Sequence, residues 1–535
     1  MLFNPLPLFE IDFYKSGHYA QYPEGTVEIF SNFTPRSSRT ENKFVIFFGL
    51  QAVLKDLHEN WKKNFFEKDI DVLLEEYKSF IDATIYPDAV TLEHIKAVHE
   101  LQYLPIEVFA VPEGSMVPVG VPVFCIRNTH KSAYWLVNYL ETKLSNALWK
   151  PITSATTAFS YLCAFHGFAE ETGADKNFIG WQGHDFSYRG MSGNEDAIMS
   201  AMAHLTSFYG TDTVPAIPAI KHYYDLDWNT NLVGGSVPAT EHSVMCAGGM
   251  NDEYGTFKRL ITEVYPKGIV SIVSDTWDYW QVITNFLPKL KEDILARDGR
   301  VVIRPDSGDP VKIICGYEIF TDKSDLMCCG DLSSAVYYNA DLDRYELYKE
   351  DHYNIPIDII PEHIVKGTFQ LLWDIFGGSV NSNGFKILNP KIGLIYGDSI
   401  TIERQQQILQ QLMQKGFTAD NLVLGIGSFT YEYVTRDTYG MAMKATNAVI
   451  EKDGVTVSVP IFKDPKTNVG SFSKKSAKGY LKVISADGGL KLIDQISSED
   501  LYAEDNVMKV VYVDNQFKQL TTFTEIRDRV KSNLE

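Results

Sequence analysis

Four short apolar runs, each ending in aspartate, glycine or serine, constrain the fold of this chain more than any other feature. They occupy residues 269–275, 301–308, 392–398 and 422–428. A short apolar run bounded by turn residues is typical of a strand that is buried on both faces, as in a parallel sheet. Because the carboxyl ends of parallel strands carry the active sites of barrel proteins, the polar residues collected there indicate a functional site.

The stretch after Asp398 gives the clearest unit of one strand and one helix. Ser399 is predicted to cap a helix, and Gly416 is predicted to end it. The apolar positions of this helix repeat at helical spacing; they are Ile402, Ile408, Leu409, Leu412 and Met413. Long helical stretches alternate with short apolar runs from about residue 151 onward, which predicts βα units and a parallel sheet.

The chain is long enough for more than one domain. Its 535 residues correspond to roughly two to four domains of average size. The first part of the chain mixes helices with short strands, such as one predicted at 107–110. We predict a barrel domain at 156–429 and a sheet-rich α/β domain formed by 1–155 together with 430–535.

The charge balance excludes several classes of partner. The chain contains 49 lysine and arginine residues and 69 aspartate and glutamate residues, which gives a formal net charge of −20. This excess of acid argues against nucleic acids and anionic membranes as partners, whereas a local basic cluster can still bind a small anion. The sequence contains neither the H-E-x-x-H motif of zinc proteases nor the G-x-S-x-G motif of α/β-hydrolases.

Other features of composition predict a cytoplasmic protein. The six cysteines form no C-x-x-C pair and no zinc spacing, so we expect reduced thiols. The first residues lack the basic and apolar regions of a secretory signal. The apolar stretches are shorter than the roughly 18 residues that cross a membrane.

Two motifs at the predicted strand ends indicate phosphate chemistry. The run G-I-G-S at 425–428 offers bare backbone amides to a phosphate, and its alternative is an ordinary tight turn. Arg304 and Asp306 flank a proline, which places a guanidinium for an anion beside a carboxylate for a hydroxyl group or a metal. The alternative is a structural turn held by an internal ion pair. Residues 183–190 and 236–243 add further clusters of polar side chains, for which a loop or a helix cap is the alternative.

Ordered segments along the chain carry a family resemblance. They include H-D-F-S-Y-R-G at 184–190, G-T-D-T at 210–213, E-H-S at 241–243 and I-R-P-D-S-G at 303–308, and the others lie at 12–15, 18–23, 110–114, 151–153, 236–238, 397–398, 435–437 and 462–465. With these segments the chain resembles the nicotinamide phosphoribosyltransferases, which are type II phosphoribosyltransferases. The resemblance extends from about residue 10 to the C-terminus and is interrupted in one place.

The resemblance implies the transfer of phosphoribose from phosphoribosyl pyrophosphate to nicotinamide, giving nicotinamide mononucleotide and pyrophosphate for NAD salvage. It implies an α/β fold, with an irregular (β/α) barrel and a second sheet-rich domain. It also implies Mg²⁺ as cofactor, ATP as coupling substrate, and a homodimer with shared active sites. Two alternatives stay open: a nicotinate phosphoribosyltransferase, and a non-catalytic binding protein on the same fold.

Position by position, the resemblance assigns five residues to the nicotinamide site. Phe186 and Tyr14 of the partner subunit would stack on the two faces of the ring. Asp212 would accept a hydrogen bond from the carboxamide, and it would repel the carboxylate of nicotinate. Arg304 and Arg189 would face the amide oxygen and the phosphate groups.

The resemblance also assigns residues to catalysis and to the phosphoribosyl group. Asp275 and Asp306 would lie near the ribose hydroxyls and near Mg²⁺, which the substrate pyrophosphate mainly holds. Arg304 and His242 complete the catalytic set, and His242 matches a histidine that ATP phosphorylates. The other ribose, phosphate and pyrophosphate contacts are Arg189, Ser236, Ser271, Gly397, Asp398, Gly427, Ser428, Arg36, Arg436, Lys444 and Lys463. Ser428 stands where the family has a glycine.

The chain departs from the family at about 313–360, where it carries an insertion. The helix that follows is predicted to begin at Pro361 and to end near Gly377. Because the insertion follows a barrel strand, we expect it to emerge near the active-site face. A lid, an oligomer contact and a passive excursion are the three alternatives for its role.

Overall fold

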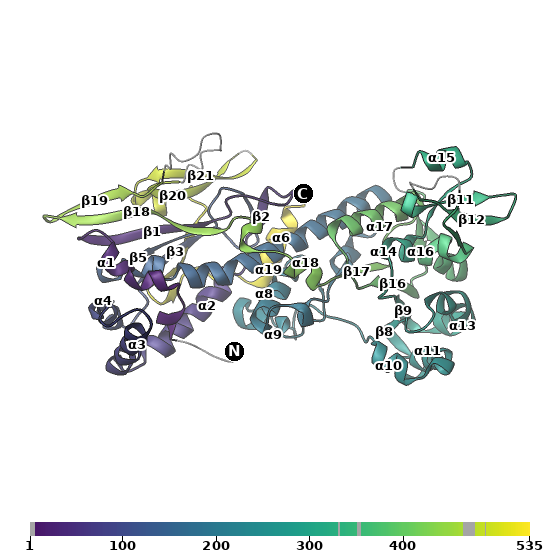
Figure 1. The fold of residues 1–535 in the computed structure, drawn as a ribbon, viewed down its shortest axis with the longest axis horizontal. Helices are drawn as coiled ribbons and strands as arrows, with labels where there is room; N and C mark the ends of the chain where they lie inside the picture. The colour runs from purple at the N-terminus through teal and green to yellow at the C-terminus, as the bar shows by residue number, and fades with distance from the viewer. Residues whose placement is uncertain (1–5, 330–331, 350–354, 464–476, 487, 535) are drawn as a thin grey trace.

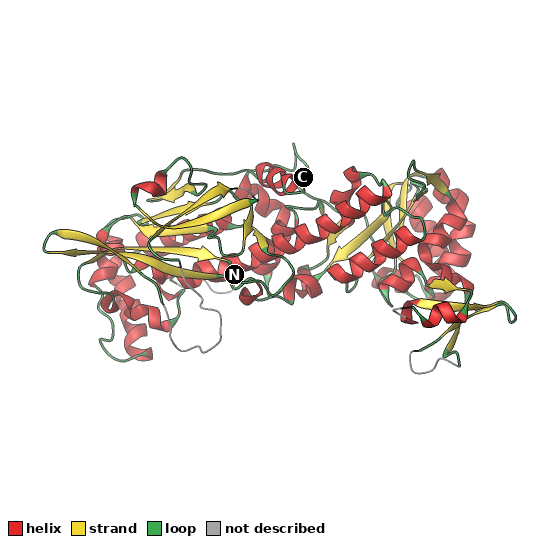
Figure 2. Cartoon of the chain, turned by 90° about the horizontal axis from the view of Figure 1, so that it is seen from above, coloured by secondary structure: helices red, strands yellow, loops and turns green. Residues whose placement is uncertain are grey.

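The computed structural model of the protein describes residues 6–329, 332–349, 355–463, 477–486 and 488–534. The molecule is elongated, with an antiparallel sheet toward one end and a helix-covered parallel sheet toward the other (Figure 1). Helix α6 (Glu141–Thr172) runs from one part into the other. Figure 2 shows the same two groups of strands from above.

A six-stranded parallel sheet forms the irregular barrel. Its strands in spatial order are β7 (Gly210–Thr211), β6 (Gly183–Asp185), β17 (Leu422–Ile426), β16 (Ile392–Tyr396), β9 (Asp298–Arg304) and β8 (Lys267–Val273). All of their pairings are parallel. The segment 235–239 joins the two edges, because Gly235 bridges to Gly210 of β7 and Ala239 bridges to Ser271 of β8. The four strands predicted from the apolar runs are confirmed, as is the α/β barrel.

The second large sheet has seven antiparallel strands. Their order is β19 (Val455–Pro460), β18 (Ala442–Lys452), β1 (Thr26–Thr34), β5 (Phe124–Asn128), β3 (Ile106–Ala110), β22 (Lys509–Val513) and β23 (Gln516–Phe517). Strand β1 pairs with β18, more than 400 residues later in the chain, so both ends of the sequence build this sheet. Two-stranded pairings are β2 (Phe44–Ile46) with β4 (Met116–Pro118), β14 (Gly378–Val380) with β15 (Lys386–Leu388), and β20 (Tyr480–Ala486) with β21 (Gly489–Ile496).

The principal helices cover both sheets. They are α2 (Leu50–Trp61), α3 (Ile70–Thr84), α4 (Glu93–His99), α8 (Asn194–His204), α9 (Ala216–Tyr224), α10 (His242–Ala247), α11 (Glu253–Arg259), α13 (Leu287–Ala296), α14 (Pro310–Cys315), α16 (Glu362–Phe376), α17 (Ile402–Gln414), α18 (Ser428–Glu432) and α19 (Phe523–Ser532). No helix in these described ranges combines the length and apolar character that crossing a bilayer requires. Cys125, Cys163, Cys246, Cys315 and Cys328 are free thiols.

Helix α17 confirms the predicted βα unit but begins later than expected. Its buried positions include Ile408, Leu409 and Leu412, which follow the predicted spacing. The cap is Thr401, whose side chain accepts a hydrogen bond from the Arg404 amide. Ser399 therefore is not the cap; its φ is +54° and its hydroxyl donates to Asp398 Oδ2 at 2.9 Å.

Two large hydrophobic clusters organise the interior, one in the barrel and one in the antiparallel sheet. Phe523, Ile526 and Val530 of α19 belong to the barrel cluster. Arg529 of the same helix donates a hydrogen bond to the Glu113 carbonyl, which lies just after β3. Helix α19 therefore contacts both parts of the molecule. The domain bounds given above stay a prediction.

The insertion forms a small sheet on the helical layer outside the barrel. Strands β10 (Glu318–Phe320), β11 (Ala335–Asn339), β12 (Arg344–Leu347) and β13 (Asp358–Ile360) pair in this order. The excursion begins at Gly316 and returns at Gly367, and a Cβ on Gly316 would lie 2.6 Å from the Gly367 nitrogen. The insertion thus leaves from the end of α14 rather than directly from the carboxyl end of β9. Helix α16 follows Pro361 and ends at Phe376, as predicted.

Candidate active site

The ring of Phe186 lies at the carboxyl ends of three barrel strands. Phe186 follows β6, and its amide donates to the Ile426 carbonyl of β17 at 3.1 Å. A Cβ on Gly425 would lie 2.8 Å from Phe186 Cε2, and one on Gly397 would lie 3.2 Å from the same atom. Larger residues at either position would displace the ring, so the two glycines fix its place. Phe186 is only partly buried, so it can stack on a second ring.

Asp212, just after β7, presents a carboxylate near this ring. His184 Nε2 lies 2.9 Å from Asp212 Oδ1, and Ser236 Oγ donates to the same oxygen at 2.7 Å. The rings of His184 and Phe186 lie 4.6 Å apart. Burial by itself would raise the pKa of Asp212, but the two hydrogen bonds and the charge of Arg304 outweigh it and lower this pKa. The carboxylate is therefore ionised at neutral pH, with Oδ1 occupied by protein donors.

Two polar groups on β8 and β9 are buried without a hydrogen-bond partner among the described residues. They are Arg304 Nε and Ser271 Oγ. The other end of the Arg304 guanidinium is fixed, because Nη2 donates to the Thr240 carbonyl at 2.6 Å. Arg304 pairs with Val273 across the two strands, so Ser271, two residues earlier, lies on the same face. Unpaired buried polar groups are costly, so a ligand oxygen at this place would be stabilising.

Asp275 connects the two loops that follow β8 and β9. Its Oδ1 lies 3.1 Å from His242 Nε2, at the start of α10. Its Oδ2 accepts hydrogen bonds from the Asp306 amide, at 2.9 Å, and from the Ser307 hydroxyl. Burial by itself would raise the pKa of Asp275, but these hydrogen bonds outweigh it and lower the pKa. The structure thus brings three predicted catalytic residues, His242, Asp275 and Asp306, into one network.

The carboxylates of this region surround the buried hydroxyl of Tyr396. Burial first, and then the charges of Asp398, Asp275 and Asp306, raise the pKa of Tyr396. Oxygen donors of this kind suit Mg²⁺, which usually takes one or two carboxylates and completes its shell with water and substrate phosphates. Within the described ranges, no three histidine, cysteine, aspartate or glutamate side chains are placed to hold a metal ion together. A Mg²⁺ ion at these carboxylates would therefore need further ligands from water or a bound phosphate.

The glycine-rich turn after β17 lies next to the Arg189 loop. Gly427 precedes α18, and Ser428 is the first residue of that helix. A Cβ on Gly190 would lie 2.6 Å from the Ser428 Cβ, so the two segments are in close contact. Arg189 is exposed beside them. Arg189, Gly427 and Ser428 thus lie together at one side of the candidate site.

The four remaining cations of the predicted site lie on the antiparallel sheet or beside it. Arg36 Nε donates to the Gly440 carbonyl at 3.0 Å, four residues after Arg436. Lys444 lies on β18, where its Nζ is 3.9 Å from Glu141. Lys463 is exposed, three residues after β19. Asp464 and Pro465, which belong to the same family segment, lie outside the described residues.

Tyr14 also lies on this surface. The next residue, Lys15, forms an ion pair at 2.8 Å with Glu141, the same acid that Lys444 approaches. The Tyr14 side chain is 62% exposed. The following helix, α1 (His18–Gln21), lies beside the antiparallel sheet and far from β16 and β17 (Figure 1). Within one chain, Tyr14 and Phe186 are therefore in different parts of the molecule.

Sequence reasoning missed three residues of the site. His184 and Ser307 hold the carboxylates of Asp212 and Asp275, and Tyr396 lies among the acids. His184 has a usable signal, because it lies two residues before Phe186 and alternate strand residues share a face. The roles of Ser307 and Tyr396 depend on contacts between strands that are distant in sequence.

Glu253, at the start of α11, gives a stability prediction. It is 4% exposed, and its Oε1 has no hydrogen-bond partner among the described residues. Burial, aided by the charge of Asp278, raises the pKa of Glu253 to about 7. The unfolded chain releases this proton at lower pH than the folded chain, so stability falls as pH rises toward and past this pKa.

Replacing Glu253 by glutamine is expected to remove that loss. The difference in melting temperature, variant minus wild type, should be larger at about pH 8 than at about pH 5.5. The change in this difference should be about 2 °C or more. Differential scanning calorimetry measures it, with exposed Glu263→Gln as control. Equal differences at both pH values would show that Glu253 is ionised throughout.

Comparisons with known proteins identify the family to which the chain belongs. The profile of the "Nicotinate phosphoribosyltransferase (NAPRTase) family" matches residues 181–519, and that of the "Nicotinamide phosphoribosyltransferase, N-terminal domain" matches residues 7–108. The nicotinamide phosphoribosyltransferase of Acinetobacter baylyi is 45% identical over 548 aligned positions, which cover 100% of this chain and 99% of that protein. The enzyme of the same name from Mycoplasma pneumoniae is 32% identical over 82% of this chain and 88% of that protein.

A solved structure shows the same fold. It is the nicotinate-nucleotide pyrophosphorylase from Pyrococcus furiosus, with a TM-score of 0.53 and 12% identity over 98% of this chain and 95% of that one. The fold and the site define a phosphoribosyltransferase. The chain belongs to the nicotinate phosphoribosyltransferase (NAPRTase) family, and the family resemblance inferred from its motifs is confirmed.

Proposed function

We propose that this enzyme transfers phosphoribose from phosphoribosyl pyrophosphate to the ring nitrogen of nicotinamide, as the names of its relatives indicate for those proteins. The observation that supports nicotinamide most directly is the ionised Asp212 carboxylate, which contacts His184, whose ring lies 4.6 Å from that of Phe186. Asp212 Oδ1 accepts from His184 and Ser236, which leaves Oδ2 for a carboxamide N–H. The pyridine ring would lie on the free face of Phe186.

The same carboxylate disfavours nicotinate. Nicotinate carries a second carboxylate where nicotinamide carries its NH₂ group, so two like charges would face each other near Asp212. Juxtaposed like charges weaken binding by several kcal/mol in partly buried sites, on the order of 2 to 5 kcal/mol. Nicotinate phosphoribosyltransferase activity is the alternative function, because the family profile carries that name.

In the proposed reaction the bond from C1′ of the ribose to pyrophosphate breaks, and a bond from C1′ to the ring nitrogen forms. Positive charge develops on the sugar and negative charge on the leaving group. Asp275 and Asp306 would hold Mg²⁺ together with the pyrophosphate, and that ion would stabilise the leaving group. Arg304 Nε and Ser271 Oγ, which lack hydrogen-bond partners in the described part of the chain, would bind oxygens of the phosphoribosyl group.

We further propose that two subunits complete each site. Tyr14, Arg36, Arg436 and Lys444 are exposed on the antiparallel sheet or beside it, and Phe186 and Asp275 lie at the barrel strand ends. In a homodimer, the antiparallel-sheet residues of one subunit would face the barrel residues of the other. This arrangement would supply a second stacking ring and the cations for pyrophosphate. It also accounts for how a chain of net charge −20 binds a polyanion.

His242 is proposed to accept phosphate from ATP and to couple that step to the transfer. Its Nε2 is held by Asp275, and its side chain is 46% exposed, so the imidazole is oriented yet accessible. Replacing His242 by alanine is expected to abolish stimulation by ATP, while basal transfer persists at a rate reduced about 10-fold or less. Pyrophosphate release with and without ATP measures both. Persisting stimulation would contradict the phosphohistidine, and His222→Ala, outside this network, is the control.

The proposed activity is tested by pyrophosphate release in a buffer at cytoplasmic pH that contains Mg²⁺ and phosphoribosyl pyrophosphate. Release should require nicotinamide. If no nitrogen heterocycle supports release, the chain is a non-catalytic binding protein on this fold.

A further inference from the structure

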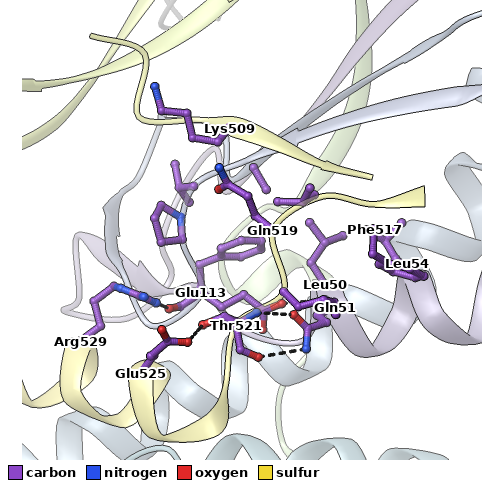
Figure 3. Close-up of a pocket in the computed structure, with 16 residues that line it drawn as sticks. Leu50, Gln51, Leu54, Glu113, Lys509, Phe517, Gln519, Thr521, Glu525 and Arg529 are labelled. Carbon is purple, nitrogen blue, oxygen red and sulfur yellow. Dashed lines mark hydrogen bonds between the residues drawn. The ribbon is translucent and has the colours of Figure 1, made fainter. Parts of the chain in front are cut away.

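A pocket separate from the candidate active site lies between α2, β22, β23 and α19. Its volume is about 200 Å³. We call it the α19 pocket; it is lined by Phe47, Leu50, Gln51, Leu54, Ala110, Val111, Pro112, Glu113, Lys509, Val511, Phe517, Gln519, Leu520, Thr521, Glu525 and Arg529. Figure 3 shows Leu50, Gln51 and Glu113 meeting Gln519, Thr521 and Arg529 from the other end of the sequence, with the Lys509 amine at the outer edge. None of them belongs to the site proposed for phosphoribosyl transfer.

The size and lining of the α19 pocket suit one aromatic ring. Phe47, Leu50 and Val111 on its floor are buried, and Phe517 adds a partly exposed aromatic face. An apolar protein cavity of roughly 150 Å³ accommodates benzene. The α19 pocket therefore has room for a single six-membered ring and one small substituent.

The acids of the pocket are already engaged by the protein. Glu113 Oε1 accepts from the Gln51 amide at 2.6 Å, and Oε2 accepts from the Gly49 amide at 2.7 Å and the Tyr224 hydroxyl at 2.9 Å. Glu525 Oε2 accepts from Thr521 and Thr522, which caps α19. These contacts tie both carboxylates to helix ends, so they are structural.

The cations of the pocket are bound less completely. Arg529 has five N–H donors, of which one is used within the described ranges, by Nη1 to the Glu113 carbonyl. Within the described ranges, Lys509 Nζ donates to the carbonyls of Ala503 and Glu504, at 3.4 and 3.1 Å. A guanidinium with free N–H groups beside an apolar floor suits a carboxylate, which it can bind through two parallel hydrogen bonds.

We propose that the α19 pocket binds a small monocyclic aromatic carboxylate, with the ring on Phe47, Leu50 and Phe517 and the carboxylate on Arg529. Its amide counterpart would lack the charge that Arg529 binds. Lys509, which reaches the same pocket from β22, would supply a second, weaker cation.

A ligand here would also stabilise a loop of the barrel. Arg527, on the opposite side of α19 from the pocket, is buried and donates to the carbonyls of Leu205, Leu232 and Val233. The last two lie in the loop that leads to Ser236, the partner of Asp212. A ligand that contacts Thr521 and Arg529 holds α19 in place, so we expect it to stabilise this loop as well.

Binding of benzoate to the full-length wild-type protein tests the proposal. Isothermal titration calorimetry should detect benzoate, and benzamide should bind about 10-fold or more weakly, because a hydrogen bond to a charged group is lost. Hydrogen exchange should slow in α19 and in residues 231–235 when benzoate is added.

Three variants locate the binding. Arg529→Gln should weaken benzoate about 10-fold to 100-fold, and Lys509→Gln should weaken it less. Exposed Lys491→Gln, which removes one charge elsewhere, should leave the affinity unchanged. Phe186→Ala should also leave it unchanged, because that ring belongs to the catalytic site.

Two results would overturn the proposal. One is the absence of benzoate binding to the wild-type protein. The other is binding that Phe186→Ala abolishes and that Arg529→Gln and Lys509→Gln both preserve, since the ligand would then occupy the nicotinamide site. Because Lys509 is partly exposed and donates to two carbonyls of the preceding loop, its variant should fold and remains informative if Arg529→Gln does not.

Discussion

Replacing Asp212 by asparagine is expected to reduce the preference for nicotinamide over nicotinate about 1,000-fold. The carboxamide loses a charged acceptor, which costs about 1.5 to 3 kcal/mol, and nicotinate no longer faces a like charge. The ratio of kcat/KM for the two substrates measures the change. The asparagine has nearly the same shape, and its side-chain carbonyl can still accept from His184 and Ser236, so the local fold should persist.

The matched control is Asp298→Asn at the amino end of β9, on the same sheet but away from the strand carboxyl ends. It should leave the ratio unchanged. If Asp212→Asn keeps the wild-type preference, then selectivity does not depend on this carboxylate. The proposed reason for choosing nicotinamide would then be wrong, even if the enzyme transfers phosphoribose.

Replacing Phe186 or Tyr14 by alanine is expected to lower kcat/KM for nicotinamide about 10-fold to 100-fold in each case, because stacking of a heterocycle on an aromatic side chain contributes about 1 to 3 kcal/mol. The two residues lie in different parts of one chain, so a Tyr14 effect of this size is expected only if the proposed second subunit completes the site. Two double variants extend this test. One combines Phe186→Ala with Asp275→Asn, and the other combines Tyr14→Ala with Arg436→Ala. Each double variant should be nearly inactive.

Mixing these two inactive variants tests whether sites are shared. If subunits exchange at random, half of the dimers are mixed, and each mixed dimer has one intact site, so about one quarter of wild-type activity should return. Phe13→Ala, an exposed neighbour of Tyr14, is the control and should keep full activity. No recovery on mixing, despite subunit exchange shown by mass spectrometry, would place both rings in sites formed by one chain.

The barrel strands were predictable from sequence because each has a run of apolar residues that are largely buried. An apolar run that ends in a polar turn has few alternatives when it is only five to seven residues long, as β8, β9, β16 and β17 are. The polar ends of these runs, at Asp275, Asp306 and Asp398, lie near one another, as expected for the carboxyl ends of neighbouring strands. Their charges meet around Tyr396 in the structure.

Contacts between distant segments were not predictable. The pairing of β1 with β18, the closure of the barrel by residues 235–239, and the hydrogen bond from Ser307 to Asp275 depend on how the elements pack. The cap of α17 shows that even a local choice between two residues could not be predicted from the sequence. Ser399 and Thr401 are both good capping residues, and the choice of Thr401 follows from the positive φ that the turn at Ser399 adopts.

The segment predicted to be an insertion leaves the barrel domain at a different place from the one expected. Its position after a barrel strand suggested that it would emerge near the active-site face. The close approach of Gly316 and Gly367 shows instead that it interrupts a helix of the outer layer, between α14 and the second half of α16. Both glycines have positive φ, near +75°, which larger residues rarely adopt.

The most direct test of the central claim is product analysis by mass spectrometry. Wild-type protein is supplied with phosphoribosyl pyrophosphate, Mg²⁺ and equimolar nicotinamide and nicotinate, with and without ATP. We predict that nicotinamide mononucleotide is the main product in both conditions and that ATP increases its yield. Nicotinate mononucleotide as the main product, or no nucleotide at all, would contradict the account.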